Sequence, residues 1–224
     1  MKKFHEPSSK KNRGNGCSRN GLAKSETLLF LKTFLKNPSH VGALAPSSRS
    51  LADAMTDFPW LFEARTVVEL GCGTGAITEA ILQKIPPAAN YLGIELDGRC
   101  IEHLRVRFPN RAFYHGSAAE MCKYLAEQGA GAPDVIISGL PWAVLPQEVQ
   151  DAIISQVVQC LAPDGMFLTF AYVHARVLPR AQRLKRQLDH CFGEVKTSRT
   201  IWKNFPPAFY YLCNEPKVDN DWQE

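Results

Sequence analysis

The chain has 224 residues, of which 45% are apolar and 21% are charged, a composition typical of one globular domain with appendages. This balance excludes collagen, a coiled coil and extensive disorder, and no segment reaches the ~20 consecutive apolar residues that a membrane-spanning helix needs. Seven cysteines stand singly, without a CxxC pair or the spacing of zinc ligands. We therefore expect reduced thiols, a cytoplasmic protein and no metal site.

The positive charge is concentrated at the N-terminus. Residues 1–24 carry seven basic side chains and one acidic side chain, whereas the rest of the chain has a net charge of −2. This segment has too few apolar residues to form a core of its own. We predict a disordered basic tail, which is either a solvated leader or an arm for an anionic surface such as a membrane or RNA.

An amphipathic helix is predicted at 25–37, because Ser25 can cap it and Pro38 ends it. Its two faces carry bulky apolar and basic side chains, notably Phe30, Phe34, Lys32 and Lys36. The helix either packs on the domain or lies in the plane of a membrane interface. A second short helix is expected within 45–55, with Ser50 and Asp53 at the spacing of a capping box. Together these helices form a predicted N-terminal region, 25–60.

A regular strand and helix alternation follows, which predicts an α/β domain at 61–215 and a polar tail at 216–224. The strands are expected at 66–70, 91–95, 112–115, 135–138 and 166–170. The helices are expected at 76–84, 98–108, 118–128, 147–160 and 180–190. Such alternation predicts a parallel, doubly wound sheet covered on both faces. Two final strands, 195–201 and 209–213, suggest an antiparallel edge.

The strongest motif is the glycine-rich junction between the first strand and the first helix of the domain. It contains Gly71, Cys72, Gly73 and Gly75. Glycine lets the backbone turn sharply and approach a ligand, and the helix N-terminus favours an anion. The same pattern fits a dinucleotide fingerprint, so the glycines alone do not identify the cofactor. Glu95, at the end of the next strand, can accept hydrogen bonds from ribose hydroxyls of either NAD or S-adenosylmethionine.

Three further features distinguish these cofactors: Glu69 before the first glycine, polar turns at 115–118 and 138–142, and the segment 161–165 before the fifth strand. With them the chain resembles, over about 41–213, the class I S-adenosylmethionine-dependent methyltransferases. The resemblance implies a Rossmann-like seven-stranded sheet with a reversed last strand. It also implies roles for the site residues. The glycine loop would hold the methionine moiety, and Glu69 would reach its amino group through water. Glu95 would bind the ribose, and Ser117 and Ala118 would border the adenine. Ser138 and Gly139 would line the methyl-transfer opening.

The turn Gly139-Leu140-Pro141-Trp142 bears on the substrate. Nucleic-acid adenine methyltransferases have Asn or Asp at the first position, where its side chain accepts a hydrogen bond from the base amine. Gly139 has no side chain for this role, which argues against base methylation, although a relative of the rRNA adenine dimethyltransferases stays an alternative. Trp142 either faces a cationic nitrogen or packs beneath a loop.

A closer resemblance is carried by four segments, 34–38, 41–47, 138–141 and 204–208. Together they resemble the bacterial phospholipid N-methyltransferases that associate with membranes. The resemblance implies methylation of phosphatidylethanolamine toward phosphatidylcholine, at the inner face of the membrane, with the first helix in the interface. Ornithine lipid or a small amine are alternative acceptors. A cofactor-binding module without catalysis and an NAD-dependent oxidoreductase are kept as hypotheses of another class.

The expected reaction is an in-line methyl transfer to a neutral amine. We predict Trp142, Tyr172, Ser138 and Gly139 as catalytic residues. Backbone carbonyls near Ser138 and Gly139 would orient the amine, Tyr172 or His174 would relay the proton, and the aromatic rings would stabilise the methylated ammonium. A basic cluster within 176–186 is either a solvated face or a contact for lipid or RNA phosphates.

Overall fold

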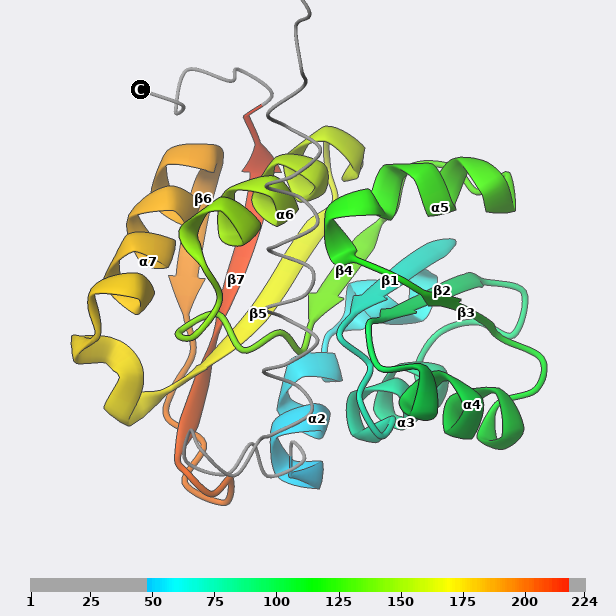
Figure 1. Ribbon diagram of the computed structural model, residues 1–224, viewed down its shortest axis with the longest axis horizontal. Coiled ribbons are helices and arrows are strands. Elements are labelled where there is room, and N and C mark those ends of the chain that lie inside the picture. Colours follow the sequence, from blue (N-terminus) through cyan, green and yellow to red (C-terminus); the bar gives the residue numbers. More distant parts are fainter. Residues whose placement is uncertain (1–47, 218–224) are drawn as a thin grey trace, which may run out of the picture.

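The computed structural model describes residues 48–217 (Figure 1). The basic tail, the predicted helix at 25–37 with its membrane contacts Phe30, Lys32, Phe34 and Lys36, and the last seven residues lie outside the described residues. None of the helices within 48–217 combines the length and the apolar character needed to cross a bilayer.

Seven strands form one sheet in the order β3-β2-β1-β4-β5-β7-β6. Their bounds are β1 Thr66–Leu70, β2 Asn90–Glu95, β3 Ala112–His115, β4 Val135–Ser138, β5 Met166–Tyr172, β6 Phe192–Thr197 and β7 Ala208–Pro216. Strands β1 to β5 are parallel, and β7 runs antiparallel to both β5 and β6. The predicted doubly wound sheet with a reversed last strand is thus confirmed. Because the strand order changes direction between β1 and β4, a crevice is expected at their carboxyl ends.

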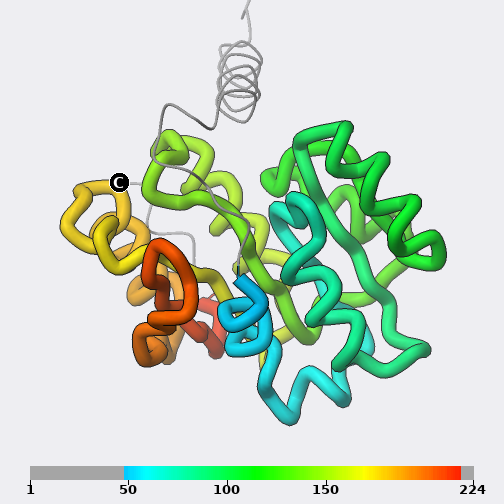
Figure 2. The backbone as a smooth tube through the Cα atoms, turned by 90° about the horizontal axis from the view of Figure 1, so that it is seen from below, coloured from blue at the N-terminus to red at the C-terminus, as the bar shows by residue number. Residues whose placement is uncertain are grey.

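Helices cover both faces of the sheet (Figures 1 and 2). One apolar cluster packs beneath α2 Arg49–Thr56, α3 Ala76–Leu82 and α4 Gly98–Arg107. The other packs beneath α5 Met121–Gln128, α6 Gln147–Cys160 and α7 Pro179–Cys191. Within residues 48–217 there are also three short 3₁₀ helices, η2 Pro59–Glu63, η3 Ala118–Glu120 and η4 Val173–Val177. All five residues of β1 are buried, as expected for a central strand with apolar layers on both sides.

Two predicted details of the element ends are wrong. The cap of α2 is Ser48, whose Oγ accepts a hydrogen bond from the Leu51 N–H at 3.2 Å; Ser50 lies inside the helix, so the proposed box with Asp53 does not form. Strand β6 begins and ends earlier than predicted, and Ile201 makes only an isolated bridge with Ala208. Pro206 and Pro207 lack a backbone N–H and interrupt a longer ladder there.

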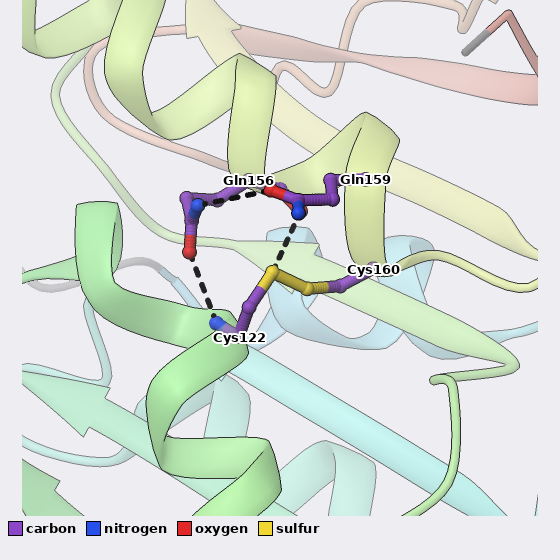
Figure 3. The surroundings of a disulfide bond; sticks show 4 residues. All are labelled: Cys122, Gln156, Gln159 and Cys160. Carbon is purple, nitrogen blue, oxygen red and sulfur yellow. Dashed lines mark hydrogen bonds between the residues drawn. A yellow bond between two sulfur atoms is a disulfide. The ribbon is translucent and has the colours of Figure 1, made fainter.

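The expectation of reduced thiols is also wrong at one pair. Cys122 and Cys160 form a disulfide with a Cα–Cα distance of 6.0 Å (Figure 3). The packing of α5 against α6 brings them together, because the Gln156 side chain accepts a hydrogen bond from the Cys122 N–H at 3.0 Å and lies one turn before Cys160. This Cα distance is usual for disulfides. The other four cysteines within 48–217 are free.

Candidate active site

The loop between β1 and α3 turns through three glycines with positive φ angles, Gly71, Gly73 and Gly75. At Gly71 (φ 77°) an added Cβ would also lie 2.8 Å from the Leu140 Cδ2. At Gly73 (φ 53°) no heavy atom lies within 4 Å of an added Cβ, so its bare backbone faces open space. Gly75 precedes the first residue of α3 and does not line the cavity described next. The loop therefore combines a conformation that requires glycine with a backbone that a ligand can approach closely.

A cavity of about 230 Å³ lies against this loop at the carboxyl ends of the parallel strands. It brings together residues that the sequence predicts as site residues and that come from the carboxyl ends of β1 to β5 or from the segments that follow them. These are Gly71, Cys72, Gly73, Glu95, Ser117, Ala118, Gly139 and Tyr172. A site at this point of a doubly wound sheet is where ligands of such folds bind.

Glu95, the last residue of β2, is buried and lines the cavity. Its Oε2 accepts a hydrogen bond from the Gly73 N–H at 2.8 Å, and its Oε1 accepts from the N–H groups of Leu96 at 2.7 Å and Asp97 at 2.9 Å. These bonds fix the carboxylate beside the glycine loop. A carboxylate has about four acceptor positions, so capacity remains for the hydroxyl of a ligand in the cavity.

Glu69 lies in β1 beneath the glycine loop and is fully buried, outside the cavity lining. Its Oε2 accepts hydrogen bonds from the Thr78 Oγ1 at 2.7 Å and from the Tyr91 hydroxyl. Burial raises the pKa of Glu69 to about 7, and the nearby Glu95 charge contributes to this rise. The hydrogen bonds to Glu69 lower the pKa but do not offset the effect of burial. The Oε1 atom has no hydrogen-bond partner among the described residues. A buried acceptor without a partner is costly and fits a ligand amino group reached through water.

Cys72 lies between the two acidic side chains and is buried. Burial, with the Glu69 and Glu95 charges, raises the pKa of its thiol well above the usual value. The thiol therefore keeps its proton near neutral pH and serves as a wall of the cavity, since the thiolate is the nucleophilic form of cysteine.

The turns after β3 and β4 complete the walls. Ser117 and Ala118 line the cavity, and the Ser117 Oγ caps η3 by accepting from the Ala119 N–H at 3.2 Å. Gly139 also lines it, whereas Ser138 is fully buried behind it. The Ser138 Oγ accepts from the Leu140 N–H at 3.3 Å, which stabilises the turn. Ser138 is thus a neighbour of the opening and does not line it.

A second cavity of about 200 Å³ adjoins the first. Both are lined by Leu140, Pro141, Phe170 and Tyr172, so these residues form their common wall. The rest of the second lining is largely apolar and comes mainly from the segment 142–144, from η4, from Leu178 and from α7, with Ala171 and Tyr211 from the sheet. None of its lining residues is an aspartate or a glutamate.

The two predicted aromatic residues differ in position. Trp142 lines only the second cavity and is buried, and its Nε1 donates a hydrogen bond to the Thr169 Oγ1 at 2.5 Å. Tyr172 is half-buried and lines both cavities. Its ring stacks on His174 with 5.6 Å between ring centroids. Burial raises the pKa of Tyr172, so its hydroxyl keeps the proton at neutral pH.

The basic cluster of the sequence divides into two groups. Arg183 makes two 2.9 Å bonds to Asp151, and Lys185 pairs with Asp189 at 2.5 Å. Arg176 instead lies over the Phe209 ring, 4.4 Å from its centroid. Local ion pairs therefore account for much of the charge on α7, but not for that of η4.

The comparisons with known proteins agree with this geometry. Residues 67–165 match the family model described as a methyltransferase domain. The chain is 35% identical over 196 residues to the ornithine lipid N-methyltransferase of Singulisphaera acidiphila, an alignment that covers 84% of this chain and 96% of that protein. The chain belongs to the class I S-adenosylmethionine-dependent methyltransferases. This membership decides between the two cofactors that the glycine motif leaves open: the cofactor is S-adenosylmethionine.

Solved structures give the same fold for this methyltransferase. It is similar to the O-methyltransferase of Bacillus cereus in complex with SAH, with a TM-score of 0.59, 13% identity and coverage of 86% of this chain and 91% of that one. It is also similar to the N-methyltransferase NodS of Bradyrhizobium japonicum, with a TM-score of 0.52, 14% identity and coverage of 89% and 99%. At such identities the likeness shows the fold alone.

The site residues fit S-adenosylmethionine. Glu69 has an unpartnered acceptor for the amino group, the open backbone at Gly73 leaves room for the methionine moiety, and Glu95 is held where a ribose hydroxyl can reach it. The individual roles of these residues stay predictions.

Several residues of the two cavities were not predicted from the sequence. Leu140, Pro141 and Phe170 are apolar and carry no chemical signal of their own. Gln150 lines neither cavity but was also not predicted; it is a fully buried amide on α6 whose Nε2 donates to the carbonyls of Trp142 at 2.7 Å and Leu145 at 3.2 Å. A lone amide on an apolar helix face was a usable signal for a residue that fixes a loop.

Proposed function

We propose that this methyltransferase methylates the amine of a membrane-lipid headgroup. The observation that carries the proposal is the apolar second cavity, which shares a wall with the cofactor cavity and has no carboxylate in its lining. The 35% identical relative, named as an ornithine lipid N-methyltransferase, supports both the nitrogen acceptor and the lipid class.

The lining of the second cavity favours the reactive form of an amine. A primary amine resembles a lysine side chain, with a pKa near ~10.4 in water, so that most of it is protonated at neutral pH. Only the neutral form has the lone pair that attacks a methyl group. An apolar cavity without an acidic partner disfavours the ammonium ion, and so it selects the neutral amine.

When bound, S-adenosylmethionine supplies an electrophilic methyl group on a sulfonium. The amine approaches it across the common wall of the two cavities, between Pro141 and Tyr172. Positioning of this kind, without a covalent intermediate, supplies most of the rate gain in a direct displacement.

Tyr172 orients the amine, and His174 takes up its proton. Because burial raises the pKa of Tyr172, its phenol stays neutral and accepts a hydrogen bond from the amine instead of acting as the base. The proton that the methylated nitrogen releases passes to the imidazole of His174, which is exposed and lines the same cavity, and from there to water. The rings of Trp142 and Tyr172 line the cavity and stabilise the methylated ammonium through cation–π contacts.

Two headgroups are consistent with this site. The relative favours ornithine lipid, whose amine is carried by an amino-acid headgroup, and the motifs of the sequence favour phosphatidylethanolamine. We propose the inner face of the cytoplasmic membrane as the place of reaction, since lipid amine and cytoplasmic cofactor meet there.

The test uses the purified full-length chain with labelled S-adenosylmethionine. Vesicles contain an anionic lipid together with ornithine lipid, phosphatidylethanolamine or neither, and the lipids are separated after reaction. Label in one or both aminolipids supports the proposal, and their ratio identifies the preferred acceptor. If the chain binds S-adenosylhomocysteine but labels only RNA adenines or a soluble amine, the lipid acceptor is wrong.

A further inference from the structure

The exposed large apolar side chains of residues 48–217 are unevenly distributed. They are Phe62, Val106, Val177, Leu178, Trp202 and Phe205. Four of these six lie on two segments, 173–180 and 198–207, which we call together the docking edge. Two of them are the aromatic residues Trp202, 76% exposed, and Phe205, 85% exposed. Aromatic residues this exposed on one face of a soluble domain indicate an interaction surface.

Both segments lie at the carboxyl ends of the parallel strands, where the active site is. The first follows β5 directly, and the second joins β6 to β7 (Figure 1). They lie side by side, because the Val173 N–H donates a hydrogen bond to the Pro207 carbonyl at 2.9 Å. Phe62 and Val106 are elsewhere: η2 leads into the start of β1, and the last turn of α4 leads toward the start of β3. They therefore belong to the opposite edge of the sheet.

The docking edge is also basic. It contains the four cations Arg176, Arg180, Arg199 and Lys203, and neither of its segments contains an aspartate or glutamate. None of the four makes a salt bridge within the described residues, in contrast to Arg183 and Lys185 on α7. Unpaired cations beside exposed apolar and aromatic side chains match the phosphates and the interfacial region of an anionic bilayer.

The second cavity opens at this edge. Leu178 is 42% exposed and lines the cavity, and the exposed His174 lines it as well. A headgroup at the edge would thus enter the acceptor cavity without crossing the protein. The chain upstream also arrives here, since the Ser48 N–H donates to the Asn204 Oδ1 at 2.9 Å. Figure 2 shows α2 beside the loop that contains Asn204. Ser48, the first of the described residues, therefore lies at the same edge.

We propose that the docking edge binds the surface of an anionic bilayer and presents the acceptor cavity to the lipid headgroups. The proposal rests on the lipid acceptor proposed above and adds a membrane contact of the folded domain itself. Val177, Trp202 and Phe205 enter the interface, while the four cations contact lipid phosphates.

The first test is sedimentation with vesicles of phosphatidylcholine, with and without phosphatidylglycerol, at low and high salt. The V177S/W202S variant replaces two apolar side chains that line neither cavity. It is expected to bind anionic vesicles at least about tenfold more weakly. The R199S/K203S variant is expected to bind anionic vesicles roughly fivefold more weakly for each cation removed, and its binding should depend less on salt. The matched control F62S/V106S changes exposed residues of the opposite edge and should bind as the wild type does.

Activity separates this proposal from the proposed function. On a short-chain, water-soluble aminolipid, V177S/W202S should work at the wild-type rate, and on vesicles it should lose activity in parallel with binding. If the wild type methylates neither form of the lipid, the proposed function is wrong. If V177S/W202S binds and methylates vesicles normally, the docking edge is wrong while the lipid acceptor stands.

Discussion

Replacement of Gly139 by alanine tests how the turn after β4 supports the cofactor site. An added Cβ at Gly139 would lie 2.6 Å from the carbonyl oxygen of Gly71, about 0.8 Å closer than the 3.4 Å at which ordinary contact begins. The obstructing atom belongs to the backbone, so no side-chain rotation relieves the overlap. Either the turn or the glycine loop must move by several tenths of an ångström.

The cost of such overpacking is typically about 1–3 kcal/mol. If the loop moves, this energy is lost from cofactor binding, because Gly71 and Gly73 line the cavity. Since 1.4 kcal/mol corresponds to a factor of ten, G139A is expected to bind S-adenosylhomocysteine roughly 10- to 100-fold more weakly. Isothermal titration calorimetry measures this affinity, and the melting temperature shows whether the fold is retained.

The matched control is G131A, the same change at a glycine with no heavy atom within 4 Å of an added Cβ and no positive φ. It should bind S-adenosylhomocysteine with the wild-type affinity. The reasoning would be refuted if G139A also bound normally and lost only its turnover rate. In that case Gly139 would act on the acceptor amine and not through the glycine loop.

Three further predictions concern buried or half-buried groups. The pKa of Glu69 is raised by burial from 4.5 to about 7, so the folded protein binds more protons than the unfolded chain between these values. The unfolding free energy of the wild type should fall by about 3 kcal/mol as the pH rises through this window. Urea unfolding of E69Q should show no such loss. If the unfolding free energy depends on pH equally in both proteins, Glu69 does not have the raised pKa. Y172F should lower turnover on lipid by about tenfold through the lost hydrogen bond, with the affinity for S-adenosylhomocysteine unchanged, and a normal rate would exclude Tyr172 from contact with the amine. The disulfide closes a segment of 38 residues, so the free energy of unfolding of C122S should be up to about 4 kcal/mol lower than that of the oxidised wild type. If reductant leaves the unfolding free energy of the wild type unchanged, the bond does not form.

The elements around the cofactor were predictable because their signals are local. The run Thr66–Leu70 is β-branched and apolar around Glu69, and the glycines that follow require special backbone angles. Such features act within a few residues, so the bounds of β1, β3, β4 and α6 agree with the predicted ranges. The position of Glu95 after the second strand follows from the same regularity.

The features that the sequence did not reveal depend on packing between distant segments. The Cys122–Cys160 bond follows from how α5 meets α6. Trp142 is buried in an apolar cluster, where Thr169, 27 residues away, accepts its indole hydrogen. The second cavity forms only where the turn after β4 meets η4 and α7. The roles predicted for Trp142 and Tyr172 depend on this cavity, because both residues line it. No periodicity within one segment encodes it.

The turn after β4 also bears on which acceptor suits this fold. Nucleic-acid adenine methyltransferases use an Asn or Asp side chain at the position of Gly139 to hold the base amine. Here that position touches the carbonyl of Gly71 so closely that even a Cβ would overlap it. With this backbone, the polar side chain that base recognition needs could enter only by displacing the cofactor loop. In the proposed reaction the amine is recognised by apolar walls, by Tyr172 and by the edge at which the cavity opens. Those features suit an aliphatic amine on a lipid better than a flipped base.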